Sequence, residues 1–179
     1  IIRRLINRQF RIMASLVSDE FVNKKDIYNL KITNDNYEIH YLLALINSKL
    51  FSFMKTKGST TASKDDFSQL TLSDIRTIPV KKITDEEQEK FKKLVVSLLD
   101  LNKELNDYIN KFIKYFSAST QIEKLTRKLE NWHELDFSDF IKELNKAIKK
   151  ASGTPLTKKD EFEWLELFEV NKKKAQDLQ

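Results

Sequence analysis

The chain of 179 residues contains no cysteine, two glycines, two prolines and two histidines. The lack of cysteine excludes a disulfide framework, thiolate metal sites and cysteine nucleophiles, and it favours a cytoplasmic protein. Gly58 and Gly153 are far apart, which excludes the clustered glycines of phosphate-cradling loops. No apolar run is long enough for a membrane span, so no membrane partner is expected. With 40% apolar and 33% charged residues, the chain is predicted to form one or two small, soluble, ordered domains.

Residues that support catalysis are equally scarce. His40 and His133 stand alone in the sequence, so structural roles are predicted for both rather than metal binding or proton transfer. Asp65 and Asp66, next to Lys64, suggest a metal-dependent nuclease as one hypothesis, but a third acidic ligand at a defined offset is not evident. We therefore expect no catalytic, cofactor-binding or metal-binding residue in this chain.

Positive charge is concentrated in the first half of the chain. The net charge is +5; residues 1–83 hold 14 lysines and arginines against 8 acidic residues, whereas residues 84–179 hold 18 against 19. A basic excess of this kind suits a polyanion such as nucleic acid. The alternative is an ordinary solvated surface.

The first 83 residues are predicted to form a small α+β domain. Alternating apolar and polar residues indicate strands within residues 1–6, 11–17 and 27–32. A helix is predicted from Glu38, with a core-facing stripe at helical spacing. That stripe comprises Ile39, Leu42, Leu43, Ile46, Leu50 and Phe53. After a polar loop over residues 55–64, Thr71 is predicted to start another helix, and Pro79 lies in a short extended piece.

Residues 84–179 are predicted to be helical throughout. Thr84 and Glu87 form a capping box at the start of a helix over residues 84–116. Its apolar residues repeat every seven positions in two columns, which predicts a coiled-coil seam that pairs within the chain or with another copy. The columns are Phe91, Leu98, Leu105 and Phe112, and Leu94, Leu101, Tyr108 and Tyr115.

Further helices are expected to complete an antiparallel bundle. Ile122, Leu125 and Leu129 indicate one helix; Asp136 or Ser138 caps the next, and Thr157 caps the last. Aromatic residues on predicted helix faces are assigned to the core, because packing explains them better than base stacking. These are Phe51, Phe53, Trp132, Phe137, Phe140, Phe162, Trp164 and Phe168.

Basic residues of the first half are the candidates for DNA contact. The arginines crowd two predicted strands and their turn, where guanidinium groups suit phosphates or guanine edges, or else discourage aggregation of an exposed strand edge. The loop over residues 55–64 offers lysines and hydroxyls for a DNA backbone, or is simply a linker. The candidates are Arg3, Arg4, Arg8, Arg11, Lys55, Lys57, Ser59, Thr60 and Lys64.

The order of these segments resembles a known family. The segments are Ile1-Ile2-Arg3-Arg4, residues 21–30, residues 41–53, which contain Leu45-Ile46-Asn47-Ser48-Lys49-Leu50, and residues 67–80, which end in Ile78-Pro79-Val80. After a short gap, Asp85-Glu86-Glu87-Gln88 follows. They are similar to the TaqI-like C-terminal specificity domain of type II adenine-N6 DNA methyltransferases and combined restriction–modification enzymes. The resemblance covers about the first hundred residues well and the tail from Asn131 to Glu169 more loosely.

The resemblance implies a target-recognition role. Residues 1–83 would be the DNA recognition domain, and residues 84–179 a helical region. The expected partners are double-stranded DNA and an upstream methyltransferase domain of the same polypeptide, which would bind S-adenosylmethionine and flip and methylate adenine. The isolated prolines leave no Asn-Pro-Pro-Tyr motif, and the start at Ile1 without methionine suggests a piece of a longer chain, so this chain is not expected to be an enzyme on its own.

Two alternatives remain open. The helical half is also typical of a protein-interaction module that docks through the seam over residues 91–115, in which case the basic half is incidental. Specificity subunits of multisubunit restriction systems, with recognition domains separated by long helices, fit the pattern as well.

Overall fold

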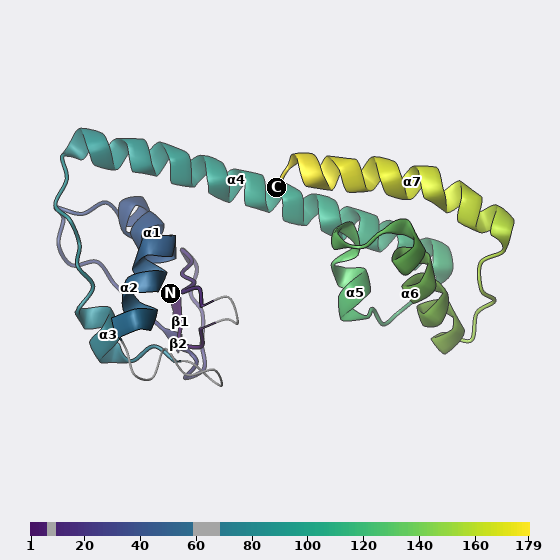
Figure 1. Cartoon of the computed structure of the whole chain (residues 1–179), viewed down its shortest axis with the longest axis horizontal. Coiled ribbons are helices and arrows are strands. Elements are labelled where there is room, and N and C mark those ends of the chain that lie inside the picture. Colours follow the sequence, from purple (N-terminus) through teal and green to yellow (C-terminus); the bar gives the residue numbers. More distant parts are fainter. Residues whose placement is uncertain (7–9, 59–68) are drawn as a thin grey trace. The chain divides into compact units, whose positions relative to one another are not determined.

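The computed structural model describes residues 1–6, 10–58 and 69–179, and the chain divides into two compact units, Ile1–Ser97 and Leu98–Gln179. The α+β prediction is confirmed, because a two-stranded antiparallel sheet is accompanied by helices over most of the described residues (Figure 1). Each unit has its own apolar core. None of the helices in these ranges combines the length and the apolar character that crossing a membrane requires.

The first unit places short strands beside helices. Its elements are β1 (Ile2–Arg3), β2 (Ile27–Tyr28), α1 (Ile39–Asn47), α2 (Lys49–Gly58), α3 (Leu72–Arg76) and the beginning of α4 (Asp85–Thr120). Its core contains Ile2, Ile12, Ile46, Phe51 and Leu70. Thr71 starts α3 with a capping box, as its position before the helix predicts.

The strands are shorter than their alternating pattern predicts. β1 lies between two neighbours, because it pairs with β2 on one side and the Arg3 N–H donates to the Met13 carbonyl at 2.9 Å on the other. The segment that contains Met13 contributes only an isolated bridge, between Ile2 and Ala14. Pairing that is divided among short, separate segments leaves no long ladder.

The predicted single helix after Glu38 is broken in two at Ser48. This residue has an extended backbone, with φ −67° and ψ 150°, and its N–H donates to the Leu45 carbonyl at 3.1 Å. The break changes the helical phase, so Phe51 becomes buried while Leu50 and Phe53 are 66% and 61% exposed. The prediction that Leu50 and Phe53 face the core is therefore wrong.

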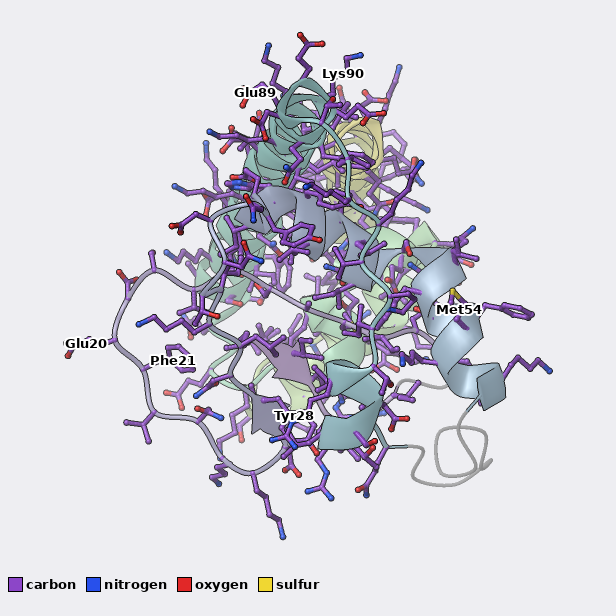
Figure 2. The ribbon with its side chains drawn as sticks, turned by 90° about the vertical axis from the view of Figure 1, so that its left-hand side faces the viewer. Glu20, Phe21, Tyr28, Met54, Glu89 and Lys90 are labelled. Atoms are coloured by element: carbon purple, nitrogen blue, oxygen red, sulfur yellow. The ribbon has the colours of Figure 1, made fainter. Side chains whose placement is uncertain are left out.

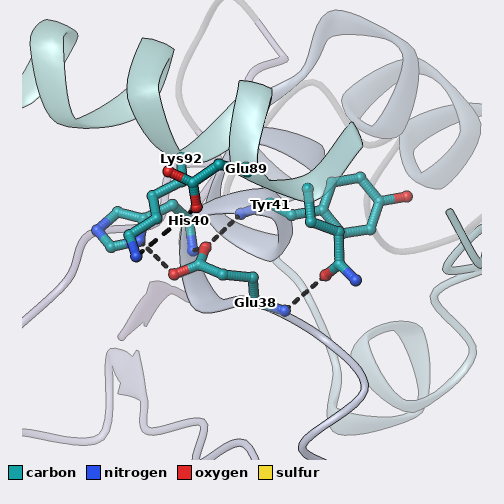
Figure 3. Close-up of polar contacts among 6 residues, drawn as sticks. Glu38, His40, Tyr41, Glu89 and Lys92 are labelled. Carbon is teal, nitrogen blue, oxygen red and sulfur yellow. Dashed lines mark hydrogen bonds and ion pairs between the residues drawn. The ribbon is translucent and has the colours of Figure 1, made fainter. Parts of the chain in front are cut away.

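A polar junction holds the start of α4 against α1 within the first unit (Figure 3). The buried Gln88 accepts a hydrogen bond from the Glu38 N–H at 2.7 Å and donates one to the Asn36 carbonyl at 3.0 Å. Beside it, the rings of Tyr41 and Phe91 lie 5.1 Å apart. The first turns of α4 are thus part of the core-forming structure of this unit.

His40 contributes to the cap of α1. Its Nδ1 lies 2.7 Å from Glu38 Oε1, and its backbone N–H donates to Glu38 Oε2 at 2.5 Å. Burial raises the pKa of Glu38, but the hydrogen bonds with the His40 side chain and backbone outweigh it and leave the pKa below its ordinary value of 4.5. The carboxylate therefore stays charged at the helix start, where negative charge is favourable.

The second unit is a helical bundle with an aromatic core. It contains the rest of α4, then α5 (Arg127–Glu130), the 3₁₀ helix η1 (Trp132–Glu134), α6 (Phe137–Lys150) and α7 (Lys158–Asp177). Asp136 caps α6 and Thr157 caps α7, as predicted. The helix predicted around Ile122–Leu129 is reduced to the single turn of α5, although Ile122 is still buried. Phe140 and Phe168 stack at 4.7 Å between ring centroids in the centre of this core.

The C-terminal part of the heptad helix packs against α7. The helix α4 extends to Thr120, beyond the predicted end at residue 116. Tyr108 donates a hydrogen bond to Asn171 Oδ1 at 2.5 Å, and the rings of Tyr115 and Trp164 lie 6.0 Å apart, so the two helices are antiparallel. Phe162, at the outer side of α7, is 77% exposed, which makes its assignment to the core wrong.

Candidate nucleic-acid interface

Two polar side chains, Asn47 and Ser52, hold the α1–α2 corner against the segment that carries Ile12 and Ala14, and Ser48 caps the start of α2. The Asn47 amide makes a paired contact with Ala14, because its Oδ1 accepts from the Ala14 N–H at 2.9 Å and its Nδ2 donates to the Ala14 carbonyl at 3.0 Å. Ser48 Oγ accepts from the Phe51 N–H at 3.0 Å, and the buried Ser52 Oγ accepts from the Ile12 N–H at 3.1 Å. These bonds therefore fix the position of the helix pair relative to the segment that follows Arg11.

The first basic group lies at the strands. Arg3 is exposed on β1, and Arg4 follows it, with its N–H donating to the Asp26 carbonyl at 2.8 Å. Arg4 is half-buried, and its Nε is buried without a hydrogen-bond partner among the described residues. Lys24 and Lys25 are exposed just before β2. These two lysines were not among the sequence candidates, although a lysine pair between two expected strands is a readable signal.

Arg11 is engaged within the fold. Its guanidinium donates to the carbonyl of Asn47, the last residue of α1, at 2.6 Å, and its side chain is half-buried. A cation at the C-terminal end of a helix also lies favourably in the helix dipole. Arg11 therefore has a structural partner, and its contact with DNA stays a prediction.

The second basic group lies at the ends of α2 and α3. Lys55 donates through Nζ to the carbonyl and hydroxyl oxygens of Thr77 at 3.1 and 2.9 Å, which brings the end of α2 beside the end of α3. Lys57 is exposed, as is Arg76 in the last turn of α3. Sequence reasoning missed Arg76, because a single arginine inside a predicted helix carries no local signal.

One segment connects the two groups inside the first unit. The Leu70 N–H donates to the Arg4 carbonyl at 2.9 Å, and the Tyr28 hydroxyl donates to the Leu70 carbonyl at 3.1 Å. Thr71 then begins α3. The strand group and the helix group therefore belong to one packed structure.

Four of the sequence candidates, Arg8, Ser59, Thr60 and Lys64, lie outside the described residues, as do Asp65 and Asp66 of the nuclease hypothesis. Over the ranges that the structure does describe, no three histidine or acidic residues gather in a way that would hold a metal ion.

Short strands, a broken helix pair and exposed basic side chains define a small α+β unit with a cationic surface, joined to a helical unit. Residues 1–80 match the family described as "TaqI-like C-terminal specificity domain", which confirms the resemblance found in the sequence. Residues 84–179 match the family described as "Domain of unknown function (DUF8810)". The chain thus belongs to the DUF8810 family and carries a TaqI-like C-terminal specificity domain in front of it.

One relative extends over nearly the same range. It is a protein of Methanocaldococcus jannaschii named "Putative type II restriction enzyme and methyltransferase RM.MjaORFECS2P", which is 36% identical over 160 residues. The match covers 85% of this chain and only 12% of the relative. No solved structure matches the chain.

Proposed function

We propose that this chain is the DNA sequence-recognition fragment of a restriction–modification DNA methyltransferase. In this proposal residues 1–83 bind duplex DNA in the cytoplasm and direct adenine-N6 methylation by an upstream catalytic domain. Residues 84–179 form a helical region that belongs to the same fragment. S-adenosylmethionine is held by the catalytic domain and not by this chain.

The match of residues 1–80 to a specificity domain is the observation that carries the proposal. The name of the relative supports a setting in which recognition, methylation and cleavage occur in one polypeptide. The excess of positive charge over residues 1–83 agrees with a DNA-binding role, because lysine and arginine contacts with phosphates supply affinity and position.

The basic side chains have different parts in this proposal. Arg3 and Lys57, which are exposed, contact phosphates or base edges directly. Arg4, which is half-buried, contacts DNA through the accessible part of its side chain. Arg11 and Lys55 contact DNA while they also hold the ends of α1 and α3. Arg8, Ser59, Thr60 and Lys64 complete the proposed set.

Fluorescence anisotropy with a random-sequence duplex at low and moderate salt tests the proposal, followed by sequencing of the retained DNA. We expect binding that weakens steeply with salt and a short enriched motif. Binding without an enriched motif would indicate that this chain binds DNA through its basic residues and that sequence specificity requires the catalytic domain. Absence of binding at low salt would refute the proposal.

A second candidate function is a helical protein-interaction module; the specificity subunit of a multisubunit restriction system, which also recognises DNA, is a variant of the first candidate. The protein-interaction module is favoured by Leu98 and Leu101 of α4, which continue the heptad columns and are 57% and 41% exposed. Joint replacement of Arg3, Arg4, Arg8 and Arg11 by alanine separates the two candidates. DNA binding is lost if the arginines recognise DNA, whereas it is unaffected if the chain is a protein-interaction module and the basic half is incidental.

A further inference from the structure

The helix α2 presents an apolar stripe to solvent. Leu50, Phe53 and Met54 are 66%, 61% and 44% exposed, while Phe51 and Ser52 on the inner side are buried. Lys57 extends the same stripe, because residues three, four and seven positions after Leu50 share one helix face. Large side chains in this arrangement form a surface suited to binding rather than scattered exposure.

The charge of α2 is of one sign. The helix contains Lys49, Lys55 and Lys57 and no acidic residue, and Lys55 links it to the end of α3, where Arg76 is exposed. The loop that carries the acidic residue Glu20 lies on the opposite side of the first unit from Met54 of α2 in the view of Figure 2. An apolar stripe with lysines at both ends is complementary to DNA, in which sugar carbons, thymine methyl groups and base faces offer apolar surface between two rows of phosphates.

We propose that the outward face of α2 is the apolar part of the DNA interface. Phe53, Met54 and Leu50 contact sugar and base surfaces in a groove, and Lys49 and Lys57 contact the flanking phosphates. This inference rests on the proposed function and adds to it an apolar contact that charge alone does not predict. Apolar side chains from DNA-binding proteins press between base steps in the same manner.

The two kinds of contact give different salt dependences, which makes the inference testable in the full chain. Phe53→Ala and Met54→Ala each weaken binding about tenfold at fixed salt, since each removes a large apolar side chain that contact with DNA buries. The slope of log K against log salt stays unchanged in both, because no counterion is involved. Lys57→Ala lowers the magnitude of that slope by about 0.9.

Phe162→Ala is the matched control. Phe162 is also an exposed phenylalanine on a helix, but it lies on α7 in the second unit. We expect this variant to bind DNA like the parent chain. Circular dichroism of each variant checks that the replaced side chain is not needed for folding, as its exposure predicts.

Contrary outcomes are distinguishable. If the parent chain binds no DNA, the proposed function fails and this inference fails with it. If the parent chain binds and Phe53→Ala and Met54→Ala bind equally well, only the inference is overturned. If the two variants instead abolish self-association measured by analytical ultracentrifugation and leave DNA binding unchanged, the stripe is a protein contact and the inference is also wrong.

Discussion

Arg11 donates a hydrogen bond to the backbone carbonyl of Asn47 at 2.6 Å, and so joins the segment that carries Ile12 and Ala14 to the last residue of α1. The contact gives a sequence-predicted DNA-binding residue a structural role. Arg3, another arginine that the sequence predicts to contact DNA, is exposed. The two arginines should therefore respond differently to replacement.

Arg11→Ala is expected to destabilise the first unit by about 1.5 kcal/mol, which is typical of a hydrogen bond to a charged donor. Amide hydrogen exchange of residues 12–14 and 43–47 would report this loss as faster exchange. Arg3→Ala should leave exchange unchanged and weaken DNA binding, with a salt slope lower by about 0.9. Unchanged exchange in Arg11→Ala would contradict the structural role.

Gln88→Ala is expected to loosen the contact between α4 and α1. The substitution removes both hydrogen bonds of a buried amide and leaves the Glu38 N–H and the Asn36 carbonyl without it, at a cost of about 2 kcal/mol. Hydrogen exchange at the start of α1 measures the effect. Glu89→Ala serves as the control, because the ion pair that Glu89 forms with Lys92 at 3.9 Å lies on the surface (Figure 3).

His133 predicts a pH dependence for the stability of the second unit. Burial lowers the pKa of His133 below its ordinary value of 6.5, against the opposing effect of Glu134, and its Nδ1 is buried without a partner in the described chain. As pH falls below about 6.5, the unfolded state binds a proton that the folded state does not. The free energy of unfolding should therefore decrease on acidification through this range, and reach its full value above it.

Trp132 provides the signal for this test, since its ring centroid lies 5.9 Å from that of His133. Urea unfolding followed by tryptophan fluorescence at several pH values should show a smaller pH dependence in His133→Gln than in the parent chain. Both tryptophans belong to the second unit, so the first unit does not contribute to this signal. Equal pH dependence in the two chains would refute the prediction.

Thr157→Ala is expected to fray the start of α7. Thr157 and Asp160 form a reciprocal cap, and the hydrogen bonds from the backbone and side chain of Thr157 lower the pKa of Asp160 below its ordinary value of 3.8. The cap contributes to the stability of α7 when the pH is above about 3.8, and this contribution is lost as the pH falls further. NMR titration of the Asp160 carboxyl should show its pKa rise toward 3.8 in the variant; an unchanged pKa would argue against the cap.

Locally encoded features could be predicted from the sequence. The helix starts at Thr71, Asp136 and Thr157 depend on side chains within three residues of the backbone groups that they satisfy. The family resemblance could be read from the same kind of contiguous pattern, and the comparisons confirm it.

The break at Ser48 could not be predicted from apolar spacing, because Ile46, Leu50 and Phe53 continue the helical period across it. The break depends on bonds to distant residues, above all those of Asn47 to Ala14 and Ser52 to Ile12. The outward face of α2 was missed for the same reason. Its exposure follows from a change of phase that only the folded chain reveals.

At the α1–α2 corner, the residues that stabilise the fold differ from the residues that are proposed to contact DNA. Its anchoring groups bind main-chain atoms from the inner side of the helix pair, so their partners do not depend on the identity of Leu50, Phe53 or Met54. A library randomised at these three outer positions, with Asn47 and Ser52 kept, should consist mainly of folded proteins. Under the proposed function, such a library offers a practical route to reprogramming the preferred DNA site.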